Sequence, residues 1–275
     1  MADQTSSSGY SIVLAGCGKM GRALLEGWLA RDLVARVLVL DPGGLPDVFQ
    51  DDPRISHSAE ISQDFGFEPD VVVLAVKPQI LDQVSKEIDL TPYKKTLILS
   101  IAAGKTLQTL EGLFGGAQPI VRVMPNTPAA IGKGMSVAVA NIPVQSAQRD
   151  MCDALLCAAG LLRWIGDESL MDAVTALSGS GPAYVFLLIE TLAKAGEKLG
   201  LSPDMAMALA RQTVIGSAAL AETAPEVSAE QLRINVTSPG GTTQAALDVL
   251  MDGSLQDVFN RALEAAEKRG KALNA

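Results

Sequence analysis

A polar, glycine-rich segment in the C-terminal half carries the residue types best suited to binding a small anion. It reads Ser238-Pro239-Gly240-Gly241-Thr242-Thr243 and stands between aliphatic, helical stretches. Pro239 and the glycine pair can begin a helix, whose first turn would hold Thr242 and Thr243 beside N–H groups without an intrahelical partner. A carboxylate there would meet fixed donors and the positive end of the helix dipole, which contributes roughly 0.3–1 kcal/mol. Taken alone, the segment is explained equally well as a loop with an ordinary N-cap.

A second glycine-rich segment, near the N-terminus, has the pattern of a dinucleotide-binding turn. The β-branched run from Ser11 to Ala15 leads into Gly16-Cys17-Gly18-Lys19-Met20-Gly21, and a helical pattern follows. In such a turn Gly16 makes the tight bend, Gly18 lets the backbone approach a pyrophosphate, and Gly21 lets the helix pack close to the strand. The pattern predicts nucleotide binding, and a purely structural strand-to-helix turn is the alternative.

An acidic residue follows the next apolar run, where a nucleotide-binding fold places its ribose contact. The run Val37 to Leu40 ends in Asp41, at about the distance along the chain at which a ribose-binding acid is expected. Asp41 therefore adds to the prediction of a nucleotide site.

Three more turns after apolar runs are unusual in composition. They are Ala75-Val76-Lys77-Pro78-Gln79, Ser100-Ile101-Ala102-Ala103-Gly104 and Val123-Met124-Pro125-Asn126-Thr127-Pro128. Open α/β sheets bind ligands at the carboxyl ends of their strands, and small residues and prolines there would keep a flat wall beside a planar ring. Lys77 would reach a phosphate or a ribose, or it is simply a solvated lysine at a strand end.

The side chains that reduce a carbonyl group are missing from the motifs. The single histidine, His57, lies among polar residues, which favours a surface position over a catalytic one. The β-hydroxyacid dehydrogenases place a lysine in the pattern Gly-x-Gly-x-x-x-Lys, whereas Gly179 and Gly181 are followed here by Val185. A cyclic imine needs less help, because a protonated C=N bond already carries its charge and the protein has mainly to position it. Thr243 would then supply a hydroxyl group to the imine nitrogen.

The composition and net charge of the whole chain limit which partners and cell compartments are possible. It has 275 residues, of which 48% are hydrophobic and 4% aromatic, and a formal net charge of −9. The negative charge argues against nucleic acid or an anionic membrane as a partner. Three cysteines without metal-like spacing indicate reduced thiols. Residues 1–10 are predicted to be a disordered leader without a signal-peptide core, and the apolar runs are too short to cross a bilayer, so we expect a soluble, cytoplasmic protein.

The elements that must position these motifs divide into two domains. Up to about Trp164, short β-branched runs alternate with helical stretches, which predicts a mostly parallel sheet in a Rossmann domain over residues 11–167. Residues 168–275 contain only helical periodicity and predict an all-helical domain. Some of its helices are apolar around much of their circumference, which favours burial against a second subunit.

Taken together, the motifs resemble those of the pyrroline-5-carboxylate reductases. The resemblance rests on the N-terminal glycine turn, the three strand-end turns, Leu177-Ser178-Gly179-Ser180-Gly181-Pro182-Ala183-Tyr184 and Ser238 to Thr243, in family order. It implies a Rossmann domain, a helical domain interleaved with that of a partner, and reduction of 1-pyrroline-5-carboxylate to L-proline with NAD(P)H. Two other hypotheses are a related hydroxy-acid dehydrogenase and a non-catalytic cofactor sensor.

The resemblance also implies which residues form the site. The substrate residues are Glu168, Val174, Ser238, Gly240, Gly241, Thr242 and Thr243, with the Thr243 hydroxyl on the ring nitrogen. The cofactor residues are Gly16, Cys17, Gly18, Lys19, Met20, Gly21, Asp41, Ala75, Val76, Lys77, Pro78, Ile101, Ala102, Ala103 and Asn235. No metal site is expected. For Glu168 a helix-start acid, and for Leu177 to Tyr184 a simple helix entry, remain as structural alternatives.

Asp41 bears on the choice of cofactor. It would face the adenosine ribose, where a 2′-phosphate meets a like charge, and Pro42 to Pro46 offers no arginine to offset it. We therefore expect NADH to be used at least as well as NADPH, although the resembled family leans towards NADPH.

Overall fold

The computed structural model describes residues 9–60 and 65–274. Within them the chain separates into two compact units. The first ends at Gly179 and also includes the C-terminal residues from Glu267, and the second runs from Ser180 to Ala266. The domain boundary expected at residue 168 stays a prediction. Most of the expected leader lies outside the described residues, and Tyr10 already belongs to the first strand.

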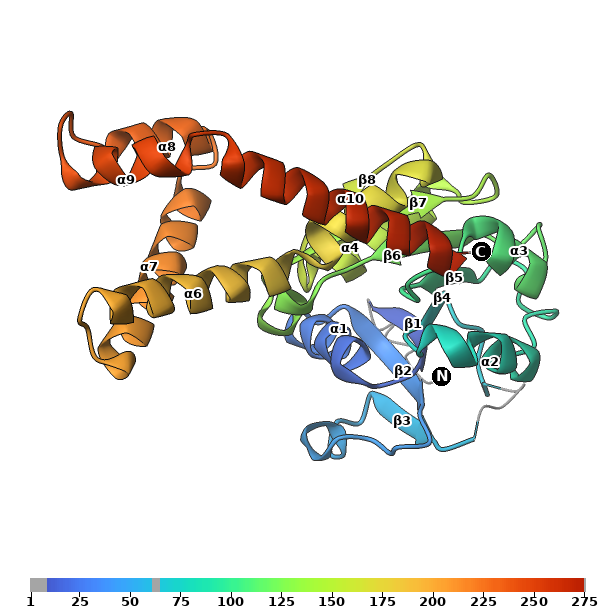
Figure 1. The fold of residues 1–275 in the computed structure, drawn as a ribbon. Coiled ribbons are helices and arrows are strands. Elements are labelled where there is room, and N and C mark those ends of the chain that lie inside the picture. Colours follow the sequence, from blue (N-terminus) through green and yellow to red (C-terminus); the bar gives the residue numbers. More distant parts are fainter. Residues whose placement is uncertain (1–8, 61–64, 275) are drawn as a thin grey trace. The chain divides into compact units, whose positions relative to one another are not determined.

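The first unit is built on one eight-stranded sheet (Figure 1). Its strands are β1 (Tyr10–Ala15), β2 (Val34–Leu40), β3 (Ile55–Ser58), β4 (Val71–Leu74), β5 (Leu97–Ser100), β6 (Ile120–Met124), β7 (Gly134–Ala140) and β8 (Gly160–Trp164). Their order across the sheet is β3-β2-β1-β4-β5-β6-β7-β8. Every neighbouring pair is parallel except β6 and β7, which pair antiparallel. The expected mostly parallel α/β sheet is therefore confirmed.

Two of these strands were not predicted. Strand β3 reads Ile-Ser-His-Ser at one edge of the sheet, and β8 reads Gly-Leu-Leu-Arg-Trp at the other. An edge strand needs only one bonded neighbour and tolerates polar residues, so neither sequence carries the apolar run that marks a central strand. His57 accordingly lies in β3, where its Nε2 is 2.8 Å from the carbonyl oxygen of Asp41.

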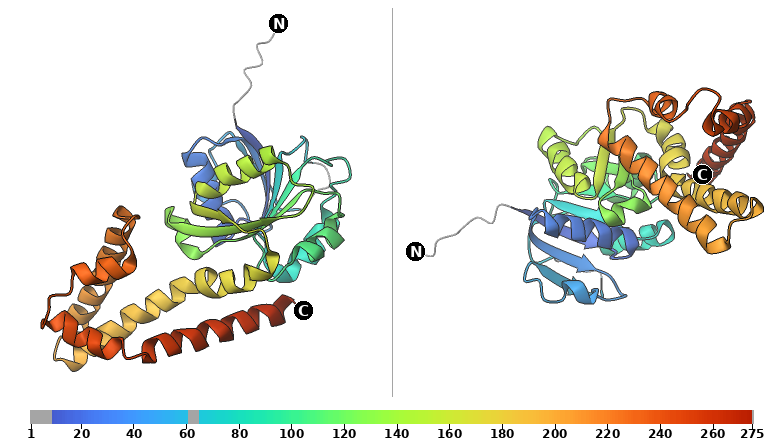
Figure 2. Two further views of the ribbon diagram at one scale, coloured as in Figure 1. Left: turned by 90° about the horizontal axis from the view of Figure 1, so that it is seen from above. Right: turned by 90° about the vertical axis from the view of Figure 1, so that its left-hand side faces the viewer.

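Helices cover both faces of the sheet (Figure 2). They are α1 (Lys19–Ala30), α2 (Leu81–Glu87), α3 (Leu107–Phe114) and α4 (Ser146–Cys157), and α5 (Met171–Val174) follows the last strand. Alternate residues of β1 face opposite sides, as strand geometry requires. Ile12 and Leu14 pack in one core with α1 and α4, whereas Val13 and Ala15 pack in the other with α2 and α3.

The second unit is entirely helical in its described residues. It comprises α6 (Gly181–Lys198), α7 (Pro203–Thr223), α8 (Ala229–Asn235), α9 (Thr242–Leu250) and most of α10 (Ser254–Asn274), whose last turns belong to the first unit. Helices α6 and α7 approach closely because the facing residues are small: a Cβ on Gly196 would lie 3.3 Å from the Cβ of Ala206. The all-helical second part expected from the sequence is therefore confirmed.

The second unit has little core of its own. Its buried cluster consists of Ala193, Ala206 and Ala210, while large apolar side chains on its helices are exposed.

One helical stretch, Glu168–Lys198, is long and apolar enough to cross a membrane. Of its apolar window, 6% is buried within the chain. The sequence reasoning measured only short apolar runs and expected none long enough to cross a bilayer, so by length and composition that expectation was wrong for this stretch. One such stretch is weak evidence for a membrane segment.

Candidate functional site

The turn between β1 and α1 has the geometry that its glycines predicted. Gly16 has φ +94°, a conformation that L side chains rarely adopt, and a Cβ there would lie 2.8 Å from the carbonyl oxygen of Ala75. A Cβ on Gly21 would collide with the backbone of Gly16, whereas one on Gly18 would meet nothing within 4 Å. The first glycine thus bends the chain, the third permits the helix to pack, and the second leaves open space beside the turn.

Helix α1 begins with free backbone donors. Its N-cap is Gly18, which offers no side-chain cap, and the first intrahelical hydrogen bond runs from the Arg22 N–H to the Gly18 carbonyl at 2.8 Å. The N–H groups of Lys19, Met20 and Gly21 therefore have no carbonyl partner within the helix. Such a helix start, followed by the positive end of the dipole, suits an anion.

Asp41 is held beside this turn by two backbone hydrogen bonds. Its Oδ2 accepts the Cys17 N–H at 2.6 Å, and its Oδ1 accepts the Gly43 N–H at 2.7 Å. The carboxylate is thus oriented from two sides and carries its charge beside the first turn of α1. Burial, together with the charge of Asp41, raises the pKa of the Cys17 thiol to about 11, so this cysteine lies in the turn as a neutral, unreactive group.

The expected wall residues follow two adjacent parallel strands. Ala75 to Pro78 come after β4, and Ile101 to Ala103 come after β5. The Ile101 N–H still donates to the Leu74 carbonyl at 3.1 Å, which keeps the two turns together beyond the regular ladder. Lys77 is exposed, so both of its interpretations stay open.

A cavity opens at this edge of the first unit. It has a volume of about 500 Å³, within the range of small-molecule sites. Its lining combines the strand-end turns with the segment after β8 and the end of α10: Pro78, Gln79, Ala103, Gly104, Lys105, Asp172, Thr175, Gly270 and Leu273. Two expected cofactor residues therefore share a cavity with the chain that carries Glu168 and Val174.

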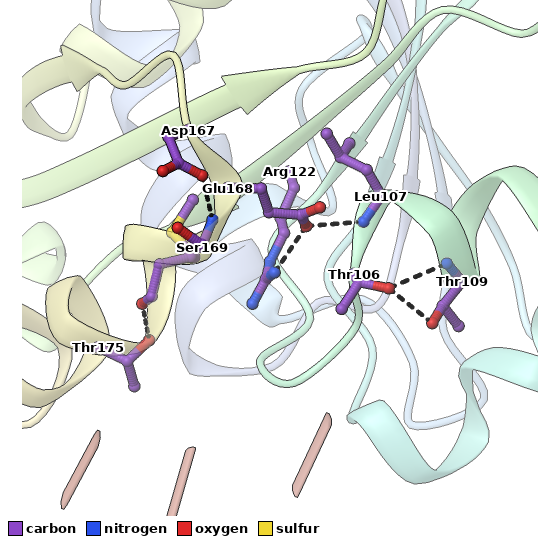
Figure 3. A network of polar contacts seen from close by, with 9 residues as sticks. Thr106, Leu107, Thr109, Arg122, Asp167, Glu168, Ser169 and Thr175 are labelled. Carbon is purple, nitrogen blue, oxygen red and sulfur yellow. Dashed lines mark hydrogen bonds and ion pairs between the residues drawn. The ribbon is translucent and has the colours of Figure 1, made fainter. Parts of the chain in front are cut away.

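Glu168 belongs to a bonded network in the first unit (Figure 3). Its Oε1 accepts from Arg122 Nη1 at 2.7 Å and from the Leu107 N–H, the first of α3, also at 2.7 Å. Arg122 stands in β6 and its side chain is 6% exposed. Glu168 begins a short 3-10 turn, Glu168–Leu170, so the helix-start alternative is met in part, but its carboxylate points to a buried arginine instead of its own helix.

Arg122 is the partner of Glu168 that the sequence reasoning missed. Its signal was present: a single charged residue inside the apolar run Ile-Val-Arg-Val-Met. A buried arginine needs a partner, and the sequence alone does not say which acid provides it. Val174, the other expected substrate residue of this unit, is half-buried in α5, directly before a π-helix over Thr175–Gly179.

The remaining expected residues lie in the second unit. Helix α9 begins at Thr242 with Gly241 as its N-cap, and Gly240 has φ +71°. The Ala245 N–H makes the first intrahelical bond, to Gly241 at 3.2 Å, so the N–H groups of the first turn lack helical partners. The predicted helix start is confirmed. Ser238 to Thr243 are largely exposed, and Asn235, at the end of α8, accepts from Gln231 at 2.8 Å.

The glycine turn, Asp41 and the strand-end turns are thus brought together in one unit, and the polar helix start is formed in the other.

Among curated proteins, a pyrroline-5-carboxylate reductase from Pseudomonas aeruginosa is 40% identical to the chain. The match covers 95% of this chain and 96% of that relative. The chain belongs to the pyrroline-5-carboxylate reductase family. A pea member of the family is 34% identical over 98% of the chain and 97% of its own length.

Family models and solved structures agree with that membership. The model for pyrroline-5-carboxylate reductase dimerisation matches residues 168–273, and one for "NADP oxidoreductase coenzyme F420-dependent" matches residues 11–104. A pyrroline-5-carboxylate reductase from Coxiella burnetii superimposes with a TM-score of 0.89 at 38% identity, covering 97% of this chain and 99% of that one. The Plasmodium falciparum enzyme, solved with NADP bound, gives 0.80 at 31% identity over 98% and 100%.

Proposed function

We propose that this chain reduces 1-pyrroline-5-carboxylate to L-proline by hydride transfer from NAD(P)H, the final step of proline biosynthesis. The observation that carries the proposal is the intact, uncapped helix start at Gly241 and Thr242 in a chain that belongs to the reductase family along nearly its whole length. A protein that only sensed the cofactor would not need this carboxylate-binding turn.

The substrate's two polar groups match the two kinds of donor at α9. Its carboxylate would accept from the backbone N–H groups of the first turn, which are exposed and lack helical partners. Thr243, also in that turn, would hydrogen-bond the ring nitrogen and so hold the C=N bond in one orientation. Because the protonated imine is already electrophilic, orientation is the main contribution asked of the protein.

The first unit fits a dinucleotide. The N–H groups at the start of α1 and the open space at Gly18 suit the pyrophosphate, and the wall after β4 and β5 suits a flat ring. When bound, the reduced nicotinamide supplies the hydride. The residues proposed to hold the cofactor are Gly16 to Gly21, Asp41, Ala75 to Pro78, Ile101 to Ala103, and Asn235 on the nicotinamide side. Glu168 and Val174 are proposed as substrate contacts from this unit.

Asp41 favours NADH. Its carboxylate is fixed by the Cys17 and Gly43 N–H groups, so it cannot swing away from a 2′-phosphate without losing both bonds. We expect kcat/KM with NADH to equal or exceed that with NADPH. Replacing Asp41 with Ser removes the charge and should shift the NADPH/NADH ratio of kcat/KM upwards by about tenfold. A wild-type enzyme that strongly prefers NADPH would contradict this assignment.

Self-association is supported by the dimerisation model that matches residues 168–273, and a homodimer is the state we propose. Exposed apolar side chains on α6, such as Phe186 and Leu187, would be covered by the second copy. The same covering accounts for the apolar stretch Glu168–Lys198 without a membrane. The protein is proposed to be soluble and cytoplasmic, and its net charge of −9 disfavours nucleic-acid partners.

The decisive experiment is oxidation of NADH and of NADPH by the purified protein with 1-pyrroline-5-carboxylate, with a β-keto acid as the control substrate. Turnover of the imine alone is expected. Turnover of the keto acid instead would make the chain a carbonyl dehydrogenase, and tight cofactor binding without turnover of either would remove the proposed substrate.

A further inference from the structure

The segment 168–179 is hydrogen-bonded near both of its ends. One donor side chain lies in strand β6, and the other lies in the turn that follows β6. Arg122, in β6, donates to Glu168 at the start of the segment. Asn126, just after β6, donates through Nδ2 to the Ser178 carbonyl near its end, at 3.2 Å. Between these two points lies Val174. The turn Met124 to Pro128, expected from the sequence as part of a flat wall at the strand ends, is thereby connected to the residues proposed to contact the substrate.

The first contact orients the Glu168 carboxylate. Val121 and Val123 belong to one core and Ile120 to the other, so Arg122 points to the same face of the sheet as Ile120. There it meets Glu168 Oε1, which also accepts the Leu107 N–H (Figure 3). Two donors converging on one oxygen fix the plane of the carboxylate. Neither bond involves its other oxygen, Oε2, and in the proposal below that oxygen faces the substrate.

The second contact fixes the far end of the segment. Asn126 Oδ1 accepts the Met135 N–H at 2.8 Å, which determines the side-chain orientation and turns Nδ2 towards Ser178. The neighbouring Gly179 lies so close to Met124 that a Cβ there would collide with its side chain. The held end is the π-helix Thr175–Gly179, a wide helical turn of the kind that is frequent at functional sites.

We propose that Arg122 and Asn126 are positioning residues for imine reduction: by holding both ends of segment 168–179 they set Glu168 and Val174 against the substrate. This inference rests on the proposed function. Neither side chain is proposed to touch the substrate, so each acts through the segment. Displacing a substrate-positioning group by about 1 Å costs up to ~100-fold in rate. The expected cofactor contacts after β1, β4 and β5 lie on chain segments that neither bond joins.

The test uses the full-length enzyme and three variants, Arg122→Gln, Arg122→Lys and Asn126→Ala. Asn141→Ala is the matched control for Asn126, because Asn141 also bonds a strand N–H, that of Ile120 at 2.8 Å, but at the opposite end of β6. Arg149→Gln is the control for Arg122, because Arg149 stacks over Trp164 at 4.6 Å, and Trp164 lies outside segment 168–179. The melting temperature, kcat, and the KM values for 1-pyrroline-5-carboxylate and for NADH are measured for each.

We expect KM for the imine to rise about tenfold in Arg122→Gln and in Asn126→Ala, with KM for NADH changed less than about twofold. Arg122→Lys, which keeps a charged donor, should recover part of the loss. Both controls should lower the melting temperature without the rise in imine KM. An unchanged imine KM in an active, folded Asn126→Ala or Arg122→Gln enzyme overturns the inference alone, as does an equal rise in the controls. Absence of imine turnover in the wild type overturns the proposed function and this inference together.

Discussion

The two units differ in where their apolar side chains lie. In the first, both faces of an eight-stranded sheet are covered, and large residues such as Trp28 and Leu110 are completely buried. In the second, five helices bury a cluster of three alanines, while Phe186 is 60% exposed. The first unit therefore contains its own hydrophobic core, whereas the second unit exposes apolar side chains of the kind found in an obligate dimer interface. The two units differ in whether residues of the same chain cover their apolar side chains.

The largest effect on the second unit is expected when the exposed face of α6 receives a charge. We expect Phe186→Glu to weaken self-association by about 100-fold or more and to remove activity with it, because an unpaired carboxylate would be buried between two copies. Light scattering during size-exclusion chromatography, over a range of protein concentrations, measures the change.

The matched control is Ile142→Glu, at an apolar residue of the first unit that is 99% exposed. It should leave association and activity as they are. If Phe186→Glu behaves like this control, α6 is not an interface and the second unit must be covered in some other way.

A smaller effect is expected at the polar helix start of the second unit. Thr243→Ala should lower kcat/KM for the imine by an amount corresponding to roughly 1.5–3 kcal/mol, the value for one hydrogen bond to a charged group. Thr243→Ser keeps the hydroxyl group and should retain most of the activity. Thr223→Ala, at the end of α7, is a control threonine whose hydroxyl bonds only its own helix, at Leu220. Steady-state kinetics decides, and unchanged values for Thr243→Ala would remove its hydroxyl group from the mechanism.

The last prediction concerns pH and belongs to the first unit, which holds all three cysteines. Burial raises the pKa of Cys17 to about 11 and that of Cys152 to about 12, from 9.0. The folded state therefore disfavours both thiolates. Their contribution to stability is fully present below pH 9 and is lost as the pH rises towards 11 and 12.

Thermal unfolding followed between pH 8 and 11 should show this decline, and alkylation at pH 8 should label the less buried Cys157 first. Early labelling of Cys152 would mean that the core beside α4 opens more readily than its burial indicates.

Much of the fold was readable from sequence because it depends on local pattern. The central strands are continuous apolar runs, and the glycine turn is specified by residues that need φ above zero or a missing Cβ, as at Gly16 and Gly21. The all-helical character of the second part was predicted from its periodicity, and α6 to α10 confirm it. The edge strands β3 and β8 were missed because pairing on one side only leaves no such pattern.

The glycine turn and the polar helix start could be predicted from the amino-acid sequence, because each motif is a contiguous run whose backbone geometry is set by its own glycines and prolines. That Glu168 meets Arg122, and that Asn126 reaches Ser178, became evident from the folded chain. Those partners are 46 and 52 residues apart. Spacing along the chain carries no information about which buried donor will face which acceptor until the sheet has placed them.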